Sequence, residues 1–526
     1  MKFSKVRLGG TAANPVIWRS GVVAAVLAAA VATLIGCAVN PVTGRNELHL
    51  VSEQDEIALG GKNYIPGQQQ AGGQWVVEPD VAAYVREVGR KLAAVSDRKQ
   101  LPYEFVILND SVPNAWAMPG GKLALNRGLL YELKSEAELA AVLGHEIVHA
   151  AGRHSARGME TGLVLQAGAA VISAASAERR HAGLVDLAAG VGSALYGMKY
   201  GRDLELEADH YGMVYMQRAG YDPAAAVALQ ETFLRLANNK SPNWLEGLFA
   251  SHPPSQERVD ANRKLAAGMG GRYLSGEAEY RKRVAPLLKS RDAYLKHDEG
   301  EKALKAGEAR KALDLADQAL RWEPREAAFH GLRGDALAKL DRHAEAEQAY
   351  DEAIRRNPDY FDFYLGRGGE RKRRGDTNGA IADFNRANSL LPTSAAHYGL
   401  GQIKLAGGQR AEGLEHLRAA ASADDASGRE AGAALARLEL PSAPGRHVAT
   451  RVEQQGDRLF LLLQNTTPVP LRDVTVAFTH PAFGRHTLHH GNLGARQTQR
   501  LALPWSASAL GGGRLQVAVI GAKVAE

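Results

Sequence analysis

A repeat with a period of 34 residues constrains how the second half of this chain can fold more tightly than any other feature. Prolines at Pro324, Pro358 and Pro392 mark the period, and an alanine stands five and twelve residues before each of them. Such a period is typical of antiparallel helix pairs that stack into a solenoid, with small residues where the helices touch. We therefore predict an α-helical array over residues 293–428. The alanines are Ala319, Ala353 and Ala387, and Ala312, Ala346 and Ala380.

The period and its small residues resemble those of tetratricopeptide repeats (TPRs). One position departs from that pattern, because the residue before each recurring glycine is charged instead of large and apolar. These residues are Glu299, Arg333 and Arg367. The resemblance implies a groove that binds a protein partner.

The N-terminal segment 1–36 has the pattern of an export signal. A basic stretch precedes an apolar run over residues 21–36, which is short of the roughly 20 residues that a spanning helix needs. The run ends at Cys37 in the sequence Leu-Ile-Gly-Cys, which resembles the lipobox of bacterial lipoproteins. Cys37 is the only cysteine, so a lipid anchor explains it better than a redox role. The alternative is an uncleaved anchor helix with an incidental cysteine.

The charge of the chain gives no support for a nucleic-acid partner. The formal net charge is +6, and removal of the four basic residues of the signal segment leaves +2. No basic stripe interleaved with aromatic residues is present, so we expect no nucleic-acid binding.

The remaining segments divide by composition and periodicity. Residues 37–75 are rich in Gly, Gln and Asn, and we expect a tether with one short helix over about 53–60. Alanine-rich helices are predicted around 162–176 and 183–196. The tail over residues 441–526 alternates with a period of two between turn residues, which predicts a small β-sandwich.

The chemistry centres on the motif His145-Glu146-Ile147-Val148-His149. Residues four apart on a helix share a face, so both imidazoles can reach one metal ion while Glu146 lies beside its open position. Zinc in such sites has three protein ligands and one water, whose pKa the metal lowers. Glu146 then takes the proton as this water attacks a carbonyl group.

The third ligand must come from another part of the chain. His154 is one candidate, but the spacing of an extended zinc motif would place a histidine at Ser155. Glu205 is the better candidate, since it lies four residues before Asp209 on a predicted helix. Asp209 is expected to accept the second N–H of a ligand histidine. Glu207 is expected to point away, into solvent.

Several motifs resemble one family of zinc peptidases. The order of motifs over residues 75–265 resembles the gluzincin metallopeptidases, which include the CAAX prenyl endopeptidases, the bacterial heat-shock membrane peptidases and the mitochondrial stress peptidases. The resemblance implies one Zn²⁺ per chain, with Glu205 as the third ligand, in an α+β, mainly helical domain over 76–275. The motifs are Asn114–Gly121, Gly128-Leu129, Glu138-Leu139-Ala140, H-E-x-x-H and the E-x-x-A-D signature at Glu205–Asp209.

Two further features are expected to shape catalysis. The segment Asn114–Met118 is predicted to present a strand edge on which an extended substrate pairs as an added strand, or else to be an interior strand. His252 and Arg258 resemble the H-P-x-x-x-x-R element of the family. His252 would then stabilise the oxyanion or bind zinc in a resting state. The alternative is that His252 packs against its loop while Arg258 pairs with an acid.

These observations predict a multidomain, lipid-anchored zinc endopeptidase that hydrolyses envelope proteins and binds a partner through its TPRs. The lipobox-like start and the segment Asn40–Arg45 are similar to exported bacterial members of the family. Members with TPRs are periplasmic proteases of outer-membrane protein quality control, which implies a periplasm-facing lipoprotein of the outer membrane. The β-like tail departs from their pattern. The alternative function is a TPR adaptor or chaperone-like protein whose peptidase domain mainly binds.

Overall fold

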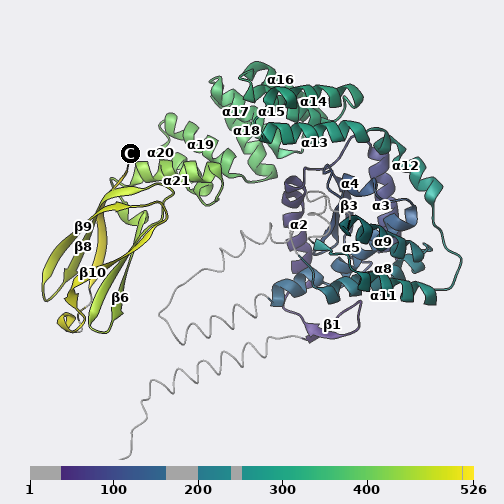
Figure 1. Cartoon of the computed structure of the whole chain (residues 1–526), viewed down its shortest axis with the longest axis horizontal. Helices are drawn as coiled ribbons and strands as arrows, with labels where there is room; N and C mark the ends of the chain where they lie inside the picture. The colour runs from purple at the N-terminus through teal and green to yellow at the C-terminus, as the bar shows by residue number, and fades with distance from the viewer. Residues whose placement is uncertain (1–36, 162–198, 239–250, 512, 514, 526) are drawn as a thin grey trace, which may run out of the picture. The chain divides into compact units, whose positions relative to one another are not determined.

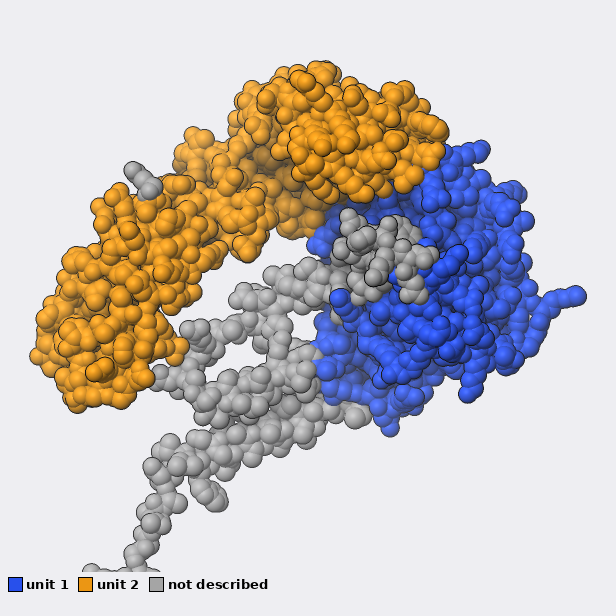
Figure 2. Space-filling view, viewed as in Figure 1, with its two compact units in different colours: residues 1–291 blue, residues 292–526 orange. Residues whose placement is uncertain are grey.

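The computed structural model divides the chain into two compact units, Met1–Arg291 and Asp292–Glu526 (Figure 2). The predicted signal segment and both alanine-rich helices lie outside the described residues. Among the helices that are described, none has the length and apolar character to cross a membrane. The residues described are 37–161, 199–238, 251–511, 513 and 515–525.

A three-stranded sheet with strand order β3-β5-β4 lies in the first unit (Figure 1). β3 (Glu104–Leu108) is parallel to β5 (Lys122–Asn126), and β4 (Ala115–Met118) is antiparallel to β5. Gly120 and Gly121 form the turn before β5, with φ values of 75° and 83° that favour glycine. Because β5 lies between β3 and β4, β4 is an edge strand of this sheet.

The helix that carries the H-E-x-x-H motif is α5 (Glu136–Ala151), and all 16 of its residues are buried. Ser135 caps it, since its Oγ accepts a hydrogen bond of 3.1 Å from the backbone N–H three residues on. α5 packs against α8 (Arg202–Arg218), where a Cβ on Gly212 would lie only 3.0 Å from the backbone nitrogen of His145. This close crossing brings the E-x-x-A-D signature beside the two motif histidines.

Further helices surround this pair. The predicted short helix is the 18-residue α2, which continues past residue 60 because Tyr64 packs on the sheet. Its hydroxyl donates to the Leu123 carbonyl oxygen at 2.6 Å, and its ring meets Trp116 edge-on. The helices are α2 (Glu53–Gln70), α3 (Pro79–Ala93), α4 (Arg127–Leu130), α9 (Ala224–Asn238), α11 (Gln256–Gly268) and α12 (Glu277–Lys289).

A small hairpin precedes α2 and contacts the C-terminal end of α5. β1 (Cys37–Val39) pairs antiparallel with β2 (Asn46–Leu48). The buried Asn40 side chain donates from Nδ2 to the Gly152 carbonyl oxygen at 3.0 Å and to Glu47 Oε2 at 2.8 Å. The hairpin is thereby held against the helix of the motif.

The second unit begins with the predicted helical array. Pro324 and Pro358 follow α14 and α16 closely, and Pro392 follows α18, as the period predicts. The repeated alanines are buried between the paired helices. The helices are α13 (Arg291–Lys305), α14 (Ala309–Trp322), α15 (Ala327–Lys339), α16 (His343–Arg356), α17 (Phe361–Arg373), α18 (Thr377–Leu390), α19 (Ser394–Ala406), α20 (Arg410–Ala421) and α21 (Ala426–Glu439).

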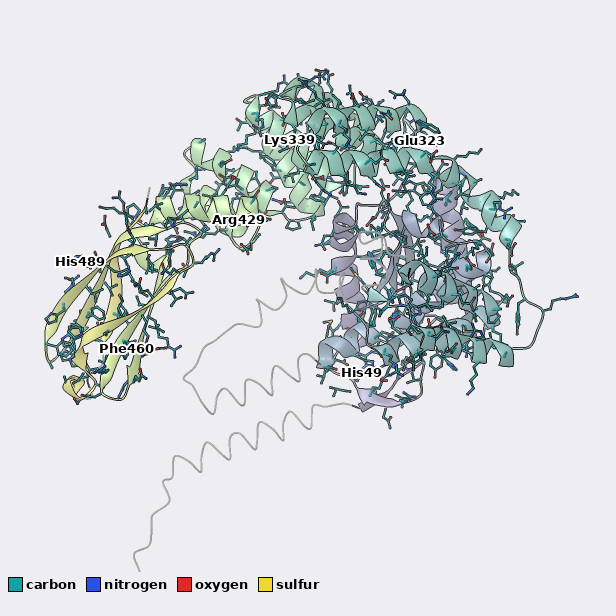
Figure 3. The ribbon with its side chains drawn as sticks, viewed as in Figure 1. His49, Glu323, Lys339, Arg429, Phe460 and His489 are labelled. Carbon is teal, nitrogen blue, oxygen red and sulfur yellow. The ribbon has the colours of Figure 1, made fainter. Side chains whose placement is uncertain are left out.

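Ion pairs explain the charged residues that interrupt the repeat pattern. Arg333 reaches Asp317 at 2.9 Å, and Arg367, one period later, reaches Asp351 at 2.7 Å and Asp383 at 2.6 Å. The guanidinium groups thus connect neighbouring helices where other repeats use apolar contacts. The side chains of this array are drawn in Figure 3, which labels Lys339 at the end of α15.

Two three-stranded antiparallel sheets, β10-β7-β6 and β11-β8-β9, complete the second unit (Figure 1). Alternate residues of β7, such as Leu461 and Leu463, are buried in one core with Val474 and Val476 of β8. The predicted small β-sandwich is confirmed. The strands are β6 (Val448–Gln455), β7 (Arg458–Asn465), β8 (Leu471–His480), β9 (Gly484–Leu493), β10 (Thr498–Ser506) and β11 (Gln516–Val524).

Candidate metal centre

Four buried side chains direct donor atoms to one point between α5, α8 and the segment before α11. They offer imidazole nitrogens and a carboxylate oxygen that all lie within 4.8 Å of one another. Imidazole and carboxylate are the ligands that zinc prefers in proteins, besides thiolate. The four are His145, His149, Glu205 and His252.

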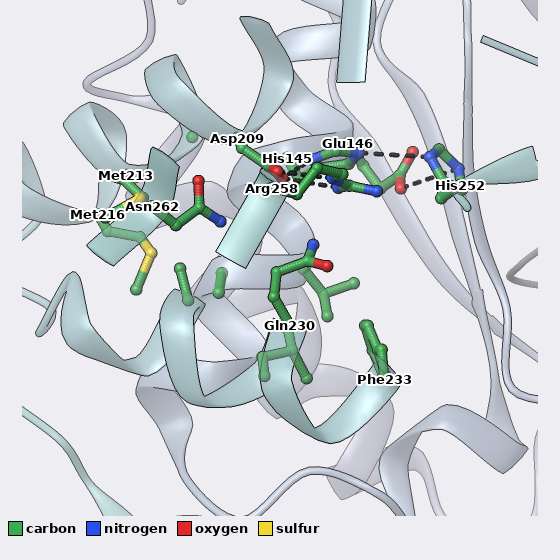
Figure 4. A pocket seen from close by; sticks show the side chains of 15 residues that line it. His145, Glu146, Asp209, Met213, Met216, Gln230, Phe233, His252, Arg258 and Asn262 are labelled. Atoms are coloured by element: carbon green, nitrogen blue, oxygen red, sulfur yellow. Dashed lines mark hydrogen bonds and ion pairs between the residues drawn. The ribbon is translucent and has the colours of Figure 1, made fainter. Parts of the chain in front are cut away.

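His145 is held by a carboxylate behind it. Its Nδ1 lies 2.9 Å from Asp209 Oδ1, and Arg258 binds the same carboxylate through Nε and Nη2, both at 2.7 Å (Figure 4). Burial alone would lower the pKa of His145, but Glu205 and Asp209 outweigh it and raise that pKa to about 10. The site therefore attracts positive charge strongly. Asp209 therefore lies where its carboxylate can accept the Nδ1–H of His145.

His149 faces the same point with its other ring nitrogen. Its Nε2 lies 3.0 Å from His145 Nε2 and 3.5 Å from Glu205 Oε1. The Tyr200 ring stacks on the imidazole at a centroid distance of 3.8 Å. Burial lowers the pKa of His149 well below its ordinary value, so the ring is neutral, the form that binds metal ions.

Glu205 closes the cluster from α8. Its Oε1 lies 3.0 Å from His252 Nδ1, and its Oε2 lies 2.8 Å from Arg258 Nη1. Burial would raise the pKa of Glu205, but His252 and His145 outweigh it and hold that pKa far below its ordinary range. The carboxylate is therefore charged and ready to bind a cation.

Glu146 lies beside these donors and is 2% exposed. Burial raises the pKa of Glu146, which makes its carboxylate a better proton acceptor. Its Oε1 is 3.5 Å from His252 Nε2, while its Oε2 is buried without a hydrogen-bond partner in the described part of the chain. A buried oxygen of this kind needs a partner that another molecule would supply.

The residues present fit a zinc ion. His145 uses Nδ1 for Asp209, so its Nε2 points at His149 Nε2 across 3.0 Å. Two such lone pairs, next to a buried carboxylate, require a positive charge between them. A divalent cation would supply that charge when bound.

The structure also places His252 and Arg258, which the sequence left open, among these residues. His252 Nδ1 lies 3.3 Å from His145 Nε2, and Arg258 pairs with both Asp209 and Glu205. These contacts differ from the alternative in which His252 packs only against its own loop. The ion pairs of Arg258 agree with the alternative in which Arg258 pairs with an acid.

Sequence reasoning missed how Glu207 is used. We expected its side chain in solvent, but it is 11% exposed and its Oε1 lies 2.9 Å from His154 Nε2. The reason is that α8 crosses α5 so closely that the N-terminal half of α8 faces the residues after α5. The signal that could have found it is His154, the histidine that follows the motif, because it contacts both His149 and Glu207.

A recess extends from the cluster between α5, α8, α9 and α11 (Figure 4). Apolar side chains form most of its wall, with Gln230 and Asn262 as the polar residues away from the metal ligands. Glu146 and His145 stand at one end of it. The apolar members are Ala141, Val142, Met213, Met216, Ala226, Leu229 and Phe233.

Comparison with known proteins agrees with this geometry. The profile of peptidase family M48 matches residues 79–266, and a tetratricopeptide repeat profile matches residues 327–360. Metalloprotease YcaL of Escherichia coli is 30% identical over 197 residues, which are 36% of this chain and 74% of YcaL. The putative beta-barrel assembly-enhancing protease of Vibrio cholerae is 32% identical over 202 residues, 36% of this chain and 40% of that protein. The beta-barrel assembly-enhancing protease of Escherichia coli is 26% identical over 324 residues, 60% of this chain and 61% of that protein.

The fold and the site define a metallopeptidase of the His-Glu-x-x-His class. The profile match and the coverage of YcaL then give the family: the chain belongs to peptidase family M48. This confirms the resemblance seen in the motifs. The chain spans less than two thirds of both beta-barrel assembly-enhancing proteases compared here, 40% and 61% of their lengths.

Proposed function

We propose that this chain is a zinc-dependent endopeptidase that cleaves proteins of the bacterial cell envelope. The observation that carries the proposal is the convergence of His145, His149 and Glu205 beside the buried, unpartnered oxygen of Glu146. His145, His149 and Glu205 would hold one zinc ion per chain. Zinc, when bound there, polarises the substrate carbonyl and makes water more acidic.

Glu146 serves as the general base in this proposal. Its carboxylate takes a proton from the attacking water and then gives it to the leaving amide nitrogen. His252 Nε2 lies 3.5 Å from Glu146 Oε1, and in this proposal it would donate to the oxygen that becomes negative. Asp209 and Arg258 keep His145 in place and do not touch the reacting atoms.

Edge strand β4 and the recess provide a means of holding substrate. An extended peptide can pair with β4 by main-chain hydrogen bonds, which are independent of sequence. The recess beside Glu146 would take one apolar substrate side chain. Unfolded or misassembled chains expose unpaired main chain and apolar side chains, the two groups that β4 and the recess would bind. Beta-barrel assembly-enhancing proteases are among the relatives. We propose misassembled outer-membrane proteins as the substrates, with the TPR groove binding a partner protein.

The location follows from the proposed anchor. An acylated Cys37 would hold the chain on the periplasmic face of the outer membrane, at the first residue of the hairpin that contacts α5. Mass spectrometry of the N-terminal peptide tests this: an acylated Cys37 supports the anchor, and an intact segment 1–36 supports an uncleaved helix.

Cleavage of casein by the zinc-loaded wild type and by Glu146→Gln tests the enzymatic proposal. We expect Glu146→Gln to bind zinc as the wild type does and to cleave about 10²–10⁴ times more slowly, because it lacks the general base. Equal cleavage by both proteins would refute the role of Glu146. Absence of zinc and of cleavage in the wild type would favour the adaptor function instead.

A further inference from the structure

Behind His149 a chain of polar contacts runs through four more residues. His149 Nδ1 lies 2.8 Å from His154 Nδ1, and His154 Nε2 lies 2.9 Å from Glu207 Oε1. Arg157 continues the chain, with Nη1 at 3.3 Å from the same Glu207 oxygen and Nη2 at 3.2 Å from Glu47 Oε1. His149 and His154 are 1% and 0% exposed, so water does not compete for these contacts.

The order of donors along this chain is fixed by its far end. The Glu207 carboxylate, paired with Arg157, can only accept hydrogen bonds, so His154 must carry its proton on Nε2. A neutral His154 then has a lone pair on Nδ1, which accepts the N–H of His149 Nδ1. The lone pair of His149 is left on Nε2, the nitrogen that faces His145 and Glu205.

The two motif histidines therefore use different supports. His145 donates directly to the carboxylate of Asp209, whereas His149 reaches a carboxylate only through an interposed imidazole. A support of this kind orients a metal ligand and selects its tautomer. We propose that His154 and Glu207 are positioning residues that hold His149 in the tautomer and orientation that bind the metal. This inference rests on the proposed function, since it assumes that His149 is a zinc ligand.

The test measures the zinc dissociation constant by competition with a chromophoric chelator, a readout that needs no catalysis. Outer-shell partners of metal ligands typically contribute about 10–100-fold to affinity. We expect Glu207→Leu and His154→Phe each to weaken zinc binding by about 10–100-fold. Asp203→Asn is the matched control, because it removes an exposed acid from α8, one helical turn before Glu207, and is expected to leave affinity unchanged.

Two additional variants separate positioning from general stability. In His154→Asn the amide oxygen would stand near the place of the imidazole Nδ1, so it still accepts the His149 N–H. This variant is expected to retain most of the zinc affinity. In that background Glu207→Leu should have little further effect, because Glu207 acts through His154. The visible spectrum of the cobalt-loaded protein should change with Glu207→Leu and stay unchanged with Asp203→Asn.

The outcomes distinguish this inference from the proposed function. Wild type that binds zinc tightly, with Glu207→Leu equal to the Asp203→Asn control, would overturn the inference and leave the function standing. Glu207→Leu that lowers the melting temperature of the metal-free protein without changing zinc affinity would also overturn it. A wild type that binds no zinc would refute the proposed function itself. If His154→Phe does not fold, His154→Asn and Glu207→Leu carry the test alone.

Discussion

The core around α5 and the core of the helical array are built on opposite principles. α5 buries His145, Glu146 and His149, and charged partners on α8 and α11 are buried with them. The array buries mostly alanine at its helix contacts, as at Ala316 and Ala346, and keeps most of its charges near the surface. Burying charge costs free energy, whereas burying small apolar residues favours folding. Charged residues are retained in a core where the chemistry of the site requires them. The core of the array needs only close packing between its helices.

The largest effect on this contrast should come from Arg258→Leu. The substitution leaves the carboxylates of Asp209 and Glu205 buried without their guanidinium partner. Breaking a buried pair in this way costs about 3–5 kcal/mol. Urea unfolding of the metal-free protein measures the loss. Arg263→Leu on the same helix is the control, since its ion pairs with Glu231 and Asp260 are exposed and contribute about 0–1 kcal/mol. Equal losses from both variants would contradict the contrast.

A smaller effect is expected from enlarging an alanine of the array. Ala346 is 0% exposed between α16 and its neighbours, so Ala346→Leu overpacks that core by about 1–3 kcal/mol. Calorimetry of the full chain measures it, and zinc affinity should not change. Ala344→Leu, on the exposed side of the same helix, should change stability by less than about 0.5 kcal/mol. The packing argument fails if Ala344→Leu destabilises as much as Ala346→Leu.

The smallest effect concerns Asp335, a carboxyl group of the helical array that is an exception to the contrast because burial affects its pKa. Burial, with Asp362 and Glu301 nearby, raises the pKa of Asp335 to about 7, and Tyr350 donates to it at 2.6 Å. Because the folded pKa lies above the unfolded value near 4, this group stabilises at low pH, and the contribution is lost as pH rises through about 7.

The second unit should therefore be more stable at pH 5 than at pH 8, and its melting temperature should be higher at pH 5. We expect the free energy of unfolding to differ by about 1 kcal/mol between the two pH values, since one pKa unit corresponds to about 1.4 kcal/mol and the side chain is only partly buried. Asp335→Asn should remove this pH dependence. If Asp335→Asn keeps the wild-type slope, another group causes it.

The sequence predicted those parts of the fold and site that depend on local spacing. Histidines four apart on a helix share a face, and the E-x-x-A-D signature gives its own helix the same property. The 34-residue period likewise placed the prolines after α14, α16 and α18. These features follow from helix geometry alone, so they were visible without a structure.

Contacts set by the crossing of two elements were not predictable in this way. The contact of Glu207 with His154 depends on the close approach of α8 to α5 at Gly212, which no pattern in either helix encodes. The extent of α2 also exceeded prediction, because its glycines and Pro66 disfavour a helix, whereas the contact of Tyr64 with the sheet stabilises it. Tertiary packing overrides weak local preference in such segments.

Zinc bound per chain after dialysis tests the central claim most directly, measured by elemental analysis for the wild type and Glu205→Leu. The wild type is predicted to retain one zinc ion, and Glu205→Leu much less than one, because the substitution removes the single carboxylate among the four convergent donors of the described residues. A wild type that holds no zinc after incubation with the metal, or a Glu205→Leu protein that holds as much as the wild type, would contradict the claim.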